Sequence, residues 1–395
     1  MSDTTLDRIL KQCHSFVANP DSNYMDDIFA QKLKAFSNPA FSSEDQKKLC
    51  TYHHKLILTE VIPAYQELAD SLESLRGTGK SSRGLAFFEG GREYYLYLLQ
   101  SQTGTYVPVG QIEKRLSAQL LSDYREISSL LKQNSSLIDR LNQCSGELTL
   151  TPTQMLEKLP ELMKKDFPEL KDATYELRTV HPSMKKFLSP AFYLTPPVDT
   201  RTPNVIYIND SGHTSSLELF GTLAHEGFPG HLYQTVSFAE NNPSDIRYLV
   251  TSSGYVEGWA TYVESYGYEY AASLMNDPDS AKNAVRLAWL NRSMNLCIYS
   301  LIDIGIHYRG WDAARTAVFL KAFGINNAST AAEIYQYIVE TPGNYLKYYW
   351  GYLNFLDLKT VCQKRLGDDF DLKEFHRRIL EIGPVQFPVL EKYMK

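Results

Sequence analysis

The sequence predicts a mainly α-helical protein with one small β-sheet in the middle of the chain. Apolar residues recur at helical spacing through most of the chain before residue 165 and after residue 210. Between these regions, short segments alternate strand-forming residue types and are bounded by proline and glycine. With 395 residues, of which 43% are hydrophobic, the chain is long enough to bury a large core.

The N-terminal region is expected to be a succession of helices. Ser43 and Gln46 stand at capping-box spacing, and an amphipathic run continues from them to about residue 75. Residues 77–82, with the sequence GTGKSS, form a loop whose glycine spacing is wrong for phosphate binding. Another helix is expected over residues 110–133. Its expected buried stripe consists of Leu116, Leu120, Leu121, Tyr124 and Ile127.

Two short segments are expected to form the sheet. Residues 174–180 alternate in polarity, and residues 204–209 form a second β run that the turn residues 210–212 end. The connection over residues 190–203 is rich in proline, threonine and aromatic residues. An edge strand here could bind a substrate backbone by strand addition, and the alternative is a purely structural hairpin.

Helical spacing resumes after residue 210. Ser215 or Ser216 can cap a helix that carries four apolar residues and leads into His225. Further helices are expected over residues 281–308, 331–340, 345–366 and 372–382. We therefore expect an N-terminal helical scaffold lobe over residues 1–170 and a second lobe over residues 171–395, with one continuous helical domain as the alternative.

The composition excludes several classes of partner. The chain has 40 Lys and Arg against 46 Asp and Glu, and this mild, dispersed net charge of −6 indicates neither nucleic acid nor a membrane as a partner. No apolar run of 18 residues occurs, and residues 1–17 lack the apolar core of a secretion signal. Free thiols in a cytoplasmic protein are the simplest account of the five scattered cysteines: Cys13, Cys50, Cys144, Cys297 and Cys362.

Residues 225–231, with the sequence HEGFPGH, are the most informative segment of the chain. Neutral imidazoles bind zinc, and a Glu beside a ligand His can take a proton from bound water. His225 and His231 are six residues apart instead of the usual four, so a regular helix would separate them by about 240°. Pro229 and Gly230 can break the helix. The motif therefore predicts a helix that ends or bulges at residues 228–230; the alternative is two core histidines beside an ordinary helix stop.

A third ligand is expected from residues 255–264, with the sequence YVEGWATYVE. A catalytic zinc site usually has three protein ligands and one open position. Glu257 and Glu264 are seven residues apart and so lie near the same helical face. We expect Glu257, among small and aromatic neighbours, to be buried and to bind the metal, with Glu264 as the next candidate. One of the two could instead hold a ligand histidine or a substrate amine, and a surface position is the alternative for Glu264 and Glu269.

These two motifs resemble a large bacterial family catalogued as domain of unknown function 885. The pair HEGFPGH and EGWATYVE is specific, and the resemblance covers roughly residues 85–395. It implies a mostly helical, zincin-like metallopeptidase with a Glu as third zinc ligand, and a zincin-like catalytic lobe over residues 171–395. Family members are usually longer, so the chain looks like a short or truncated member. Weaker matching segments are residues 91–95, 301–307, 342–345, 370–376 and 383–385.

The resulting chemistry is hydrolysis. His225, His231 and Glu257 would hold zinc, and Glu226 would act as general base and then pass the proton to the leaving amine. Amide hydrolysis also needs a donor for the oxyanion of the tetrahedral intermediate.

Three further side chains are candidates for roles in the site. His307 and Tyr345 lie in family-like segments and could donate to the oxyanion. The alternatives are a cation at a helix C-terminus for His307 and core packing for Tyr345. Arg292 could bind a substrate carboxylate, although a structural ion pair is the simpler account.

We expect a zinc-dependent peptidase that cleaves short peptides or peptide-like amides. A zinc hydrolase of a non-peptide ester or amide is a second hypothesis, and a helical binding protein with a non-catalytic metal site is a third. Glu226 argues against the third, because a metal site that only binds has no need for a base. The sequence leaves side-chain preference, exo or endo action and oligomeric state open.

Overall fold

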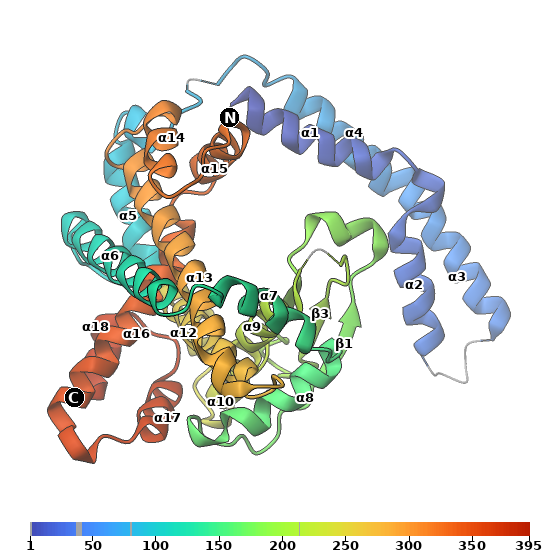
Figure 1. The fold of residues 1–395 in the computed structure, drawn as a ribbon. Coiled ribbons are helices and arrows are strands. Elements are labelled where there is room, and N and C mark those ends of the chain that lie inside the picture. The colour runs from blue at the N-terminus through green and yellow to red at the C-terminus, as the bar shows by residue number, and fades with distance from the viewer. Residues whose placement is uncertain (1, 37–41, 80, 213) are drawn as a thin grey trace. The chain divides into compact units, whose positions relative to one another are not determined.

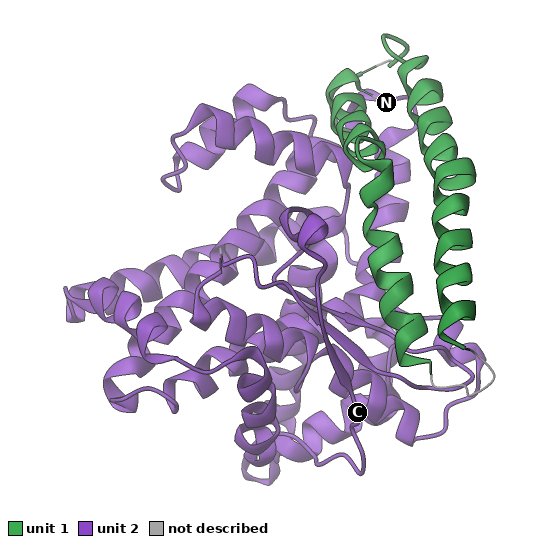
Figure 2. Cartoon of the chain, turned by 90° about the vertical axis from the view of Figure 1, so that its right-hand side faces the viewer, with its two compact units in different colours: residues 1–84 green, residues 85–395 purple. Residues whose placement is uncertain are grey.

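The chain forms two compact units, residues 1–84 and 85–395 (Figure 2). The computed structural model describes residues 2–36, 42–79, 81–212 and 214–395. Helices account for most of the described chain, and the one small sheet lies in the second unit (Figure 1). This confirms the predicted mainly helical fold with a small sheet.

The first unit consists of paired helices. α1 packs against α4 around the buried Leu6, Leu10, Cys13 and Ala69. α3 begins one residue earlier than predicted, because Ser42 rather than Ser43 caps it and forms a capping box with Asp45. The predicted loop over residues 77–82 includes Lys80, which lies outside the described residues. The helices of this unit are α1 (Asp3–Val17), α2 (Tyr24–Ala35), α3 (Ser43–Leu56) and α4 (Ile62–Glu73), with short turns at Pro20–Ser22 and Ile57–Val61.

The second unit is a larger helical body with one core. Before the sheet it has α5 (Gly91–Thr103), α6 (Val109–Gln133), α7 (Leu137–Glu147) and α8 (Pro152–Leu162). After the sheet come α9 (Ser216–Glu226), α10 (His231–Glu240), α11 (Ile246–Leu249), α12 (Ser253–Ala272), α13 (Pro278–His307), α14 (Ala313–Lys321), α15 (Ala328–Glu340), α16 (Asn344–Leu366), α17 (Leu372–Ile382) and α18 (Phe387–Met394). Among its described residues, short 3-10 turns lie at Leu85–Phe87, Met163–Lys165, Pro182–Phe187 and Gly367–Asp369.

The boundary expected at residue 170 falls inside the second unit. Leu116 and Leu156, from helices before that point, belong to the same buried cluster as Phe220 and Trp259 from helices after it. The two sides therefore share one core and do not separate into lobes. The expected stripe on α6 was partly wrong: Leu121 and Tyr124 are exposed, because the buried face of this helix runs through Val109, Ile112, Leu116 and Leu120.

The sheet has three strands in the order β1-β3-β2. β1 (Glu176–Thr179) and β3 (Val205–Ile208) match the two predicted segments and pair in parallel. β2 (Ala191–Leu194) pairs antiparallel with β3, and it lies within the connection for which no strand was predicted. β2 also packs against α9, so this strand stands beside the helix that carries the His-Glu pair.

A close crossing of two helices positions the segment that carries Glu257. α12 packs against α9 on one side and α16 on another. Gly258 lies against Gly351 of α16 so closely that a Cβ on Gly258 would come 2.5 Å from the Gly351 Cα. The glycine that follows Glu257 therefore allows the backbones of α12 and α16 to touch, and this crossing fixes Glu257 relative to the first turns of α16.

The state of the cysteines and the apolar character of the helices relate to where in the cell the protein is located. All five cysteines lie in the described part of the chain and are free thiols. The cytoplasmic location that the cysteines suggested stays a prediction. Among the described residues, no helix has the length and apolar character needed to cross a membrane.

Candidate metal centre

The chain breaks between the two histidines of the first motif. α9 ends at Glu226 and α10 begins at His231, so the predicted interruption is confirmed and starts slightly earlier than residue 228. Gly230 is required there, because a Cβ at this position would lie 1.8 Å from the carbonyl oxygen of His225. The indole Nε1 of Trp259 donates to the Pro229 carbonyl at 2.9 Å and ties the break to α12.

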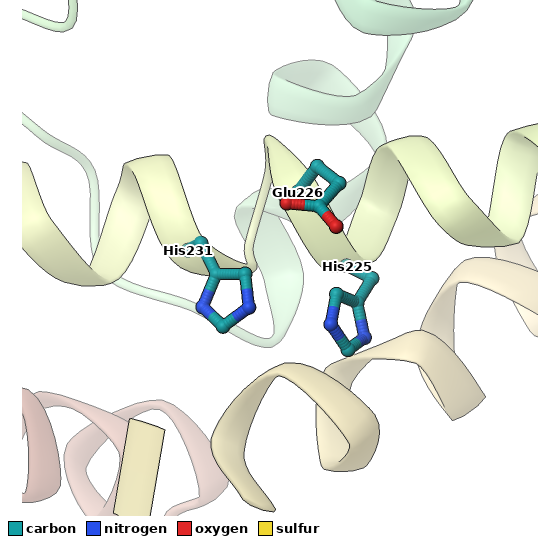
Figure 3. Close-up of side chains that lie close together, drawn as sticks. All are labelled: His225, Glu226 and His231. Carbon is teal, nitrogen blue, oxygen red and sulfur yellow. The ribbon is translucent and has the colours of Figure 1, made fainter. Parts of the chain in front are cut away.

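The break brings both imidazoles to one place. The ring centroids of His225 and His231 are 4.8 Å apart with nearly perpendicular planes. Figure 3 shows the two rings on the same side of the interrupted helix. One ligand atom from each of His225, Glu226 and His231 lies within 4.8 Å of the other two. Two residues that a regular helix would point apart therefore face a common space.

Glu257 enters the same space from α12. Its Oε2 lies 3.4 Å from Nε2 of His231 and 3.8 Å from Nε2 of His225. Ligand atoms about 2.0–2.2 Å from a tetrahedral zinc stand about 3.3–3.6 Å from one another. Both distances are close to this range, so Glu257 fits a shared zinc ion with either histidine after only small adjustments.

The electrostatics of Glu257 also suit a cation. Burial opposes ionisation of this carboxyl, but the neighbouring His231, His225 and Lys347 lower its pKa to about 2. The Lys347 ammonium lies 3.6 Å from the Glu257 Oε1. Glu257 is therefore an anion over the whole neutral range, which is the state in which a carboxylate binds a metal.

Glu264 lies beside His225, near the ring nitrogen that faces away from Glu257. Its Oε2 lies 3.3 Å from Nδ1 of His225, the ring nitrogen that faces away from Glu257, and its Oε1 accepts from Nε of Arg292 at 3.0 Å. Burial opposes its charge, but Arg292 and His225 hold the pKa of Glu264 below its ordinary value. A carboxylate on the far nitrogen of a metal-binding histidine fixes its tautomer and orientation. Arg292 thus forms a structural ion pair with Glu264, which was the simpler of the two roles expected for it from the sequence.

Glu226 is held by the edge strand of the sheet. Its Oε2 accepts the backbone N–H of Tyr193, in β2, at 2.9 Å. The sequence pointed to Glu226 but not to Tyr193, because strand β2 itself was not predicted. Glu269, the other acid weighed with Glu264, is exposed.

Two residues of α16 border the site and were not chosen from the sequence. The Tyr348 ring lies roughly parallel to the His225 ring, with centroids 6.4 Å apart. Burial and the neighbouring Glu257 carboxylate raise the pKa of Tyr348, so its hydroxyl keeps its proton. Lys347 lies over the same ring, with Nζ 5.0 Å from its centroid. The turn at Pro342-Gly343 signalled the start of this helix, and the tyrosine that borders the site is one turn beyond Tyr345.

Tyr345 packs among other tyrosines. Its ring centroid is 4.9 Å from that of Tyr299 and 6.0 Å from that of Tyr337. Burial raises the pKa of Tyr345 to about 12. These contacts are the core packing that was the alternative for this residue, and they favour Tyr348 over Tyr345 as a hydrogen-bond donor in the site.

The oxyanion role expected for His307 is wrong. The fully buried ring accepts the N–H of Leu85 at Nδ1 (3.1 Å) and donates from Nε2 to the Ile338 carbonyl (2.8 Å). Burial lowers the pKa of His307 to about 4, so it is not a helix-end cation either. It lies fifteen residues after Arg292 on α13, which is about 22 Å along the helix. Both ring nitrogens of His307 are therefore used in structural hydrogen bonds.

Comparison with known families covers nearly the whole chain. The model of the family described as "Bacterial protein of unknown function (DUF885)" matches residues 1–394. The match extends the resemblance seen over roughly residues 85–395 to the N-terminal helices. No curated protein matches the sequence.

Two solved structures share the fold. The crystal structure of "the putative lipoprotein from Colwellia psychrerythraea" matches with a TM-score of 0.83 and 21% identity, over 100% of this chain and 70% of that chain. The structure of "a putative lipoprotein of unknown function from Shewanella oneidensis" matches with a TM-score of 0.61 and 17% identity, over 92% of this chain and 69% of that chain. At these identities the likeness establishes the fold alone.

Proposed function

This chain belongs to the bacterial family of unknown function DUF885, and we propose that it is a zinc-dependent hydrolase that cleaves short peptides. The observation that carries the proposal is that the Glu257 carboxylate lies within 3.8 Å of a ring nitrogen of both His225 and His231, whose ring centroids are 4.8 Å apart. On the same basis we propose a zincin-like fold, with the His-Glu helix beside a small sheet. A zinc ion held by these side chains would polarise the scissile carbonyl and lower the pKa of a bound water to about 7.

Glu226 is the proposed general base. Its Oε2 accepts the Tyr193 N–H, so the other carboxylate oxygen is free to take the proton of the attacking water. The same carboxyl then gives this proton to the departing amine nitrogen as the carbon–nitrogen bond breaks. The hydrogen bond from β2 keeps the carboxylate beside the two histidines instead of letting it turn to solvent.

Tyr348 is the proposed donor to the oxyanion, in place of His307. Its hydroxyl keeps its proton and stands next to Glu257, and its ring lies roughly parallel to the His225 ring. A hydroxyl in that place can donate to negative charge that develops on the carbonyl oxygen in the transition state. Lys347, beside it, adds a positive charge to the same side of the site.

Metal content tests the proposal most directly. We expect protein purified without chelator to carry about one zinc per chain, because the site offers three ligands to one ion. Replacing His225 or His231 with Ala should remove that zinc, whereas His14→Ala, at an exposed histidine of α1, should keep it. The measurement is elemental analysis of the four proteins, and equal zinc in all of them would place the metal elsewhere.

Cleavage assays separate the three hypotheses. A panel of quenched short peptides should be hydrolysed, inhibited by chelator and restored by added zinc. A zinc-containing protein that cleaves ester or anilide substrates but no peptide would support the non-peptide hydrolase. Zinc without hydrolysis of any substrate would support a binding protein, and the intact Glu226 argues against that outcome.

Tyr348→Phe should lower kcat by about 10²- to 10³-fold, the usual cost of losing one oxyanion donor. KM and zinc content should change little, because the lost hydrogen bond acts mainly in the transition state. Tyr345→Phe is the matched control, since it removes a hydroxyl one turn away on the same helix. Steady-state kinetics with one peptide would check this, and a larger kcat loss in Tyr345→Phe would return the role to Tyr345.

A further inference from the structure

A pocket of about 320 Å³ lies at the end of strand β2. Val236 and Ala239 of α10 line one side of it, and Pro196, Val198 and Tyr248 line others. The exposed Leu194 and Val198 add apolar surface beside it. Pockets that bind whole small molecules occupy about 300–1,000 Å³. This pocket is at the small end of that range, so its size suits a single large side chain.

The pocket lies near the candidate metal centre, and α10 and Tyr193 connect the two places. Thr235 lines it and follows His231 by four residues on α10, which is about 6 Å along the helix. Tyr193 joins the two places, because its N–H donates to Glu226 and its hydroxyl donates to the side chain of Asn204 at 2.7 Å. Asn204 also lines the pocket. A peptide that passes Glu226 along β2 would therefore place a neighbouring side chain here.

The walls of the pocket are joined by side-chain contacts. The Arg201 guanidinium lies over the Tyr248 ring, 5.4 Å from its centroid, and its Nη1 is 3.4 Å from the Ala239 carbonyl oxygen. These contacts connect the loop after β2 with α10 and with the segment that carries α11. A pocket held open in this way takes a side chain without first ordering its own walls, which favours binding.

We propose that this pocket is a specificity site that binds a bulky apolar side chain of the substrate, such as that of leucine or phenylalanine, next to the cleaved bond. The proposal rests on the hydrolase function proposed above, and it adds the class of peptide. The apolar residues of α10 and the proline-containing loop match such a side chain. Tyr193 separates it from Glu226, so the side chain enters the pocket while the backbone stays at the metal centre.

Filling the pocket tests the proposal. Quenched peptides should differ only in one residue, Gly, Ala, Leu or Phe, placed in turn on either side of the cleaved bond. At the position served by the pocket, the unmodified protein should prefer Leu or Phe over Gly by about 10- to 100-fold in kcat/KM. Ala239→Leu should reduce that preference to a few-fold, mainly by lowering kcat/KM for the Leu and Phe peptides.

The matched control fills a different pocket of the same unit. Ala173 lines a separate apolar pocket of about 340 Å³ that includes Phe228 and Tyr233. Ala173→Leu should leave the preference for Leu and Phe intact. Retention of the full preference by Ala239→Leu, or its loss in Ala173→Leu, would overturn the assignment of the specificity site.

A binding measurement separates this proposal from the proposed function. The same peptides should bind to Glu226→Gln protein, followed by fluorescence anisotropy, with Leu and Phe tighter than Gly, and Ala239→Leu should abolish the difference. Binding with this pattern but no cleavage by the unmodified protein would keep the pocket and reject the hydrolase. Cleavage with a preference that Ala239→Leu does not change would keep the hydrolase and reject the pocket, and the absence of any peptide binding would reject the pocket as well.

Discussion

Glu226→Gln should lower turnover by about 10²- to 10⁴-fold, which is the usual contribution of a general base, while bound zinc stays nearly unchanged. Glutamine has the shape of glutamate and can still accept the N–H of Tyr193, but its amide cannot take a proton from water. The two histidines and Glu257 remain in place. Single-turnover kinetics on a short peptide and elemental analysis of the same sample would measure both quantities.

The control for this variant is a substitution of Tyr193 in strand β2, whose backbone N–H donates to Glu226. Tyr193→Phe leaves the backbone N–H that reaches Glu226 and removes only the hydroxyl that contacts Asn204. Turnover should then fall much less than in Glu226→Gln. Loss of zinc in Glu226→Gln would show that Glu226 binds the metal and is not the base, and full turnover would leave the hydrolase without its proton acceptor.

The interruption between α9 and α10 could be predicted from the sequence because its cause is local. A six-residue spacing between His225 and His231, with Pro229 and Gly230 between them, admits few backbone solutions. Glu257 was likewise found from its own neighbours, since the glycine beside it marks a close approach that the structure places against Gly351. Local sequence therefore located the three converging side chains and the helices that carry them.

The contacts that sequence reasoning missed depend on residues far apart in the chain. The ring of His307 is held by Leu85 and Ile338, which no local pattern connects to it. Strand β2 forms because β3 pairs with it, although its own segment is rich in proline. Tyr348 differs from Tyr345 only by one helical turn, and the packing of α16 against α12 decides which of the two reaches Glu257.

The charges around His225 support the proposal of a bound cation. Three carboxylates, Glu226, Glu257 and Glu264, all act to raise the pKa of His225, against the effect of its burial. Arg292 pairs with Glu264 and Lys347 lies near Glu257, while Glu226 accepts the backbone N–H of Tyr193. A bound divalent cation would complete this balance, and it would also keep the histidines neutral, as metal ligands must be.

Glu257→Gln should weaken zinc binding by more than about 100-fold. By comparison, loss of a residue that only holds a metal ligand in place usually costs about 10- to 100-fold in metal affinity. The change replaces a charged ligand with a weaker neutral one, and it leaves the Lys347 ammonium near the metal without its carboxylate. Glu264→Gln, which alters only the partner of His225 Nδ1, should fall within that smaller range. Competition with a chromophoric chelator would give both affinities, and thermal unfolding of the metal-free proteins would control for damage to the fold. Because the two acids differ mainly in which histidine nitrogen they face, a stronger loss in Glu264→Gln would move the third ligand to Glu264 and leave Glu257 as the supporting residue.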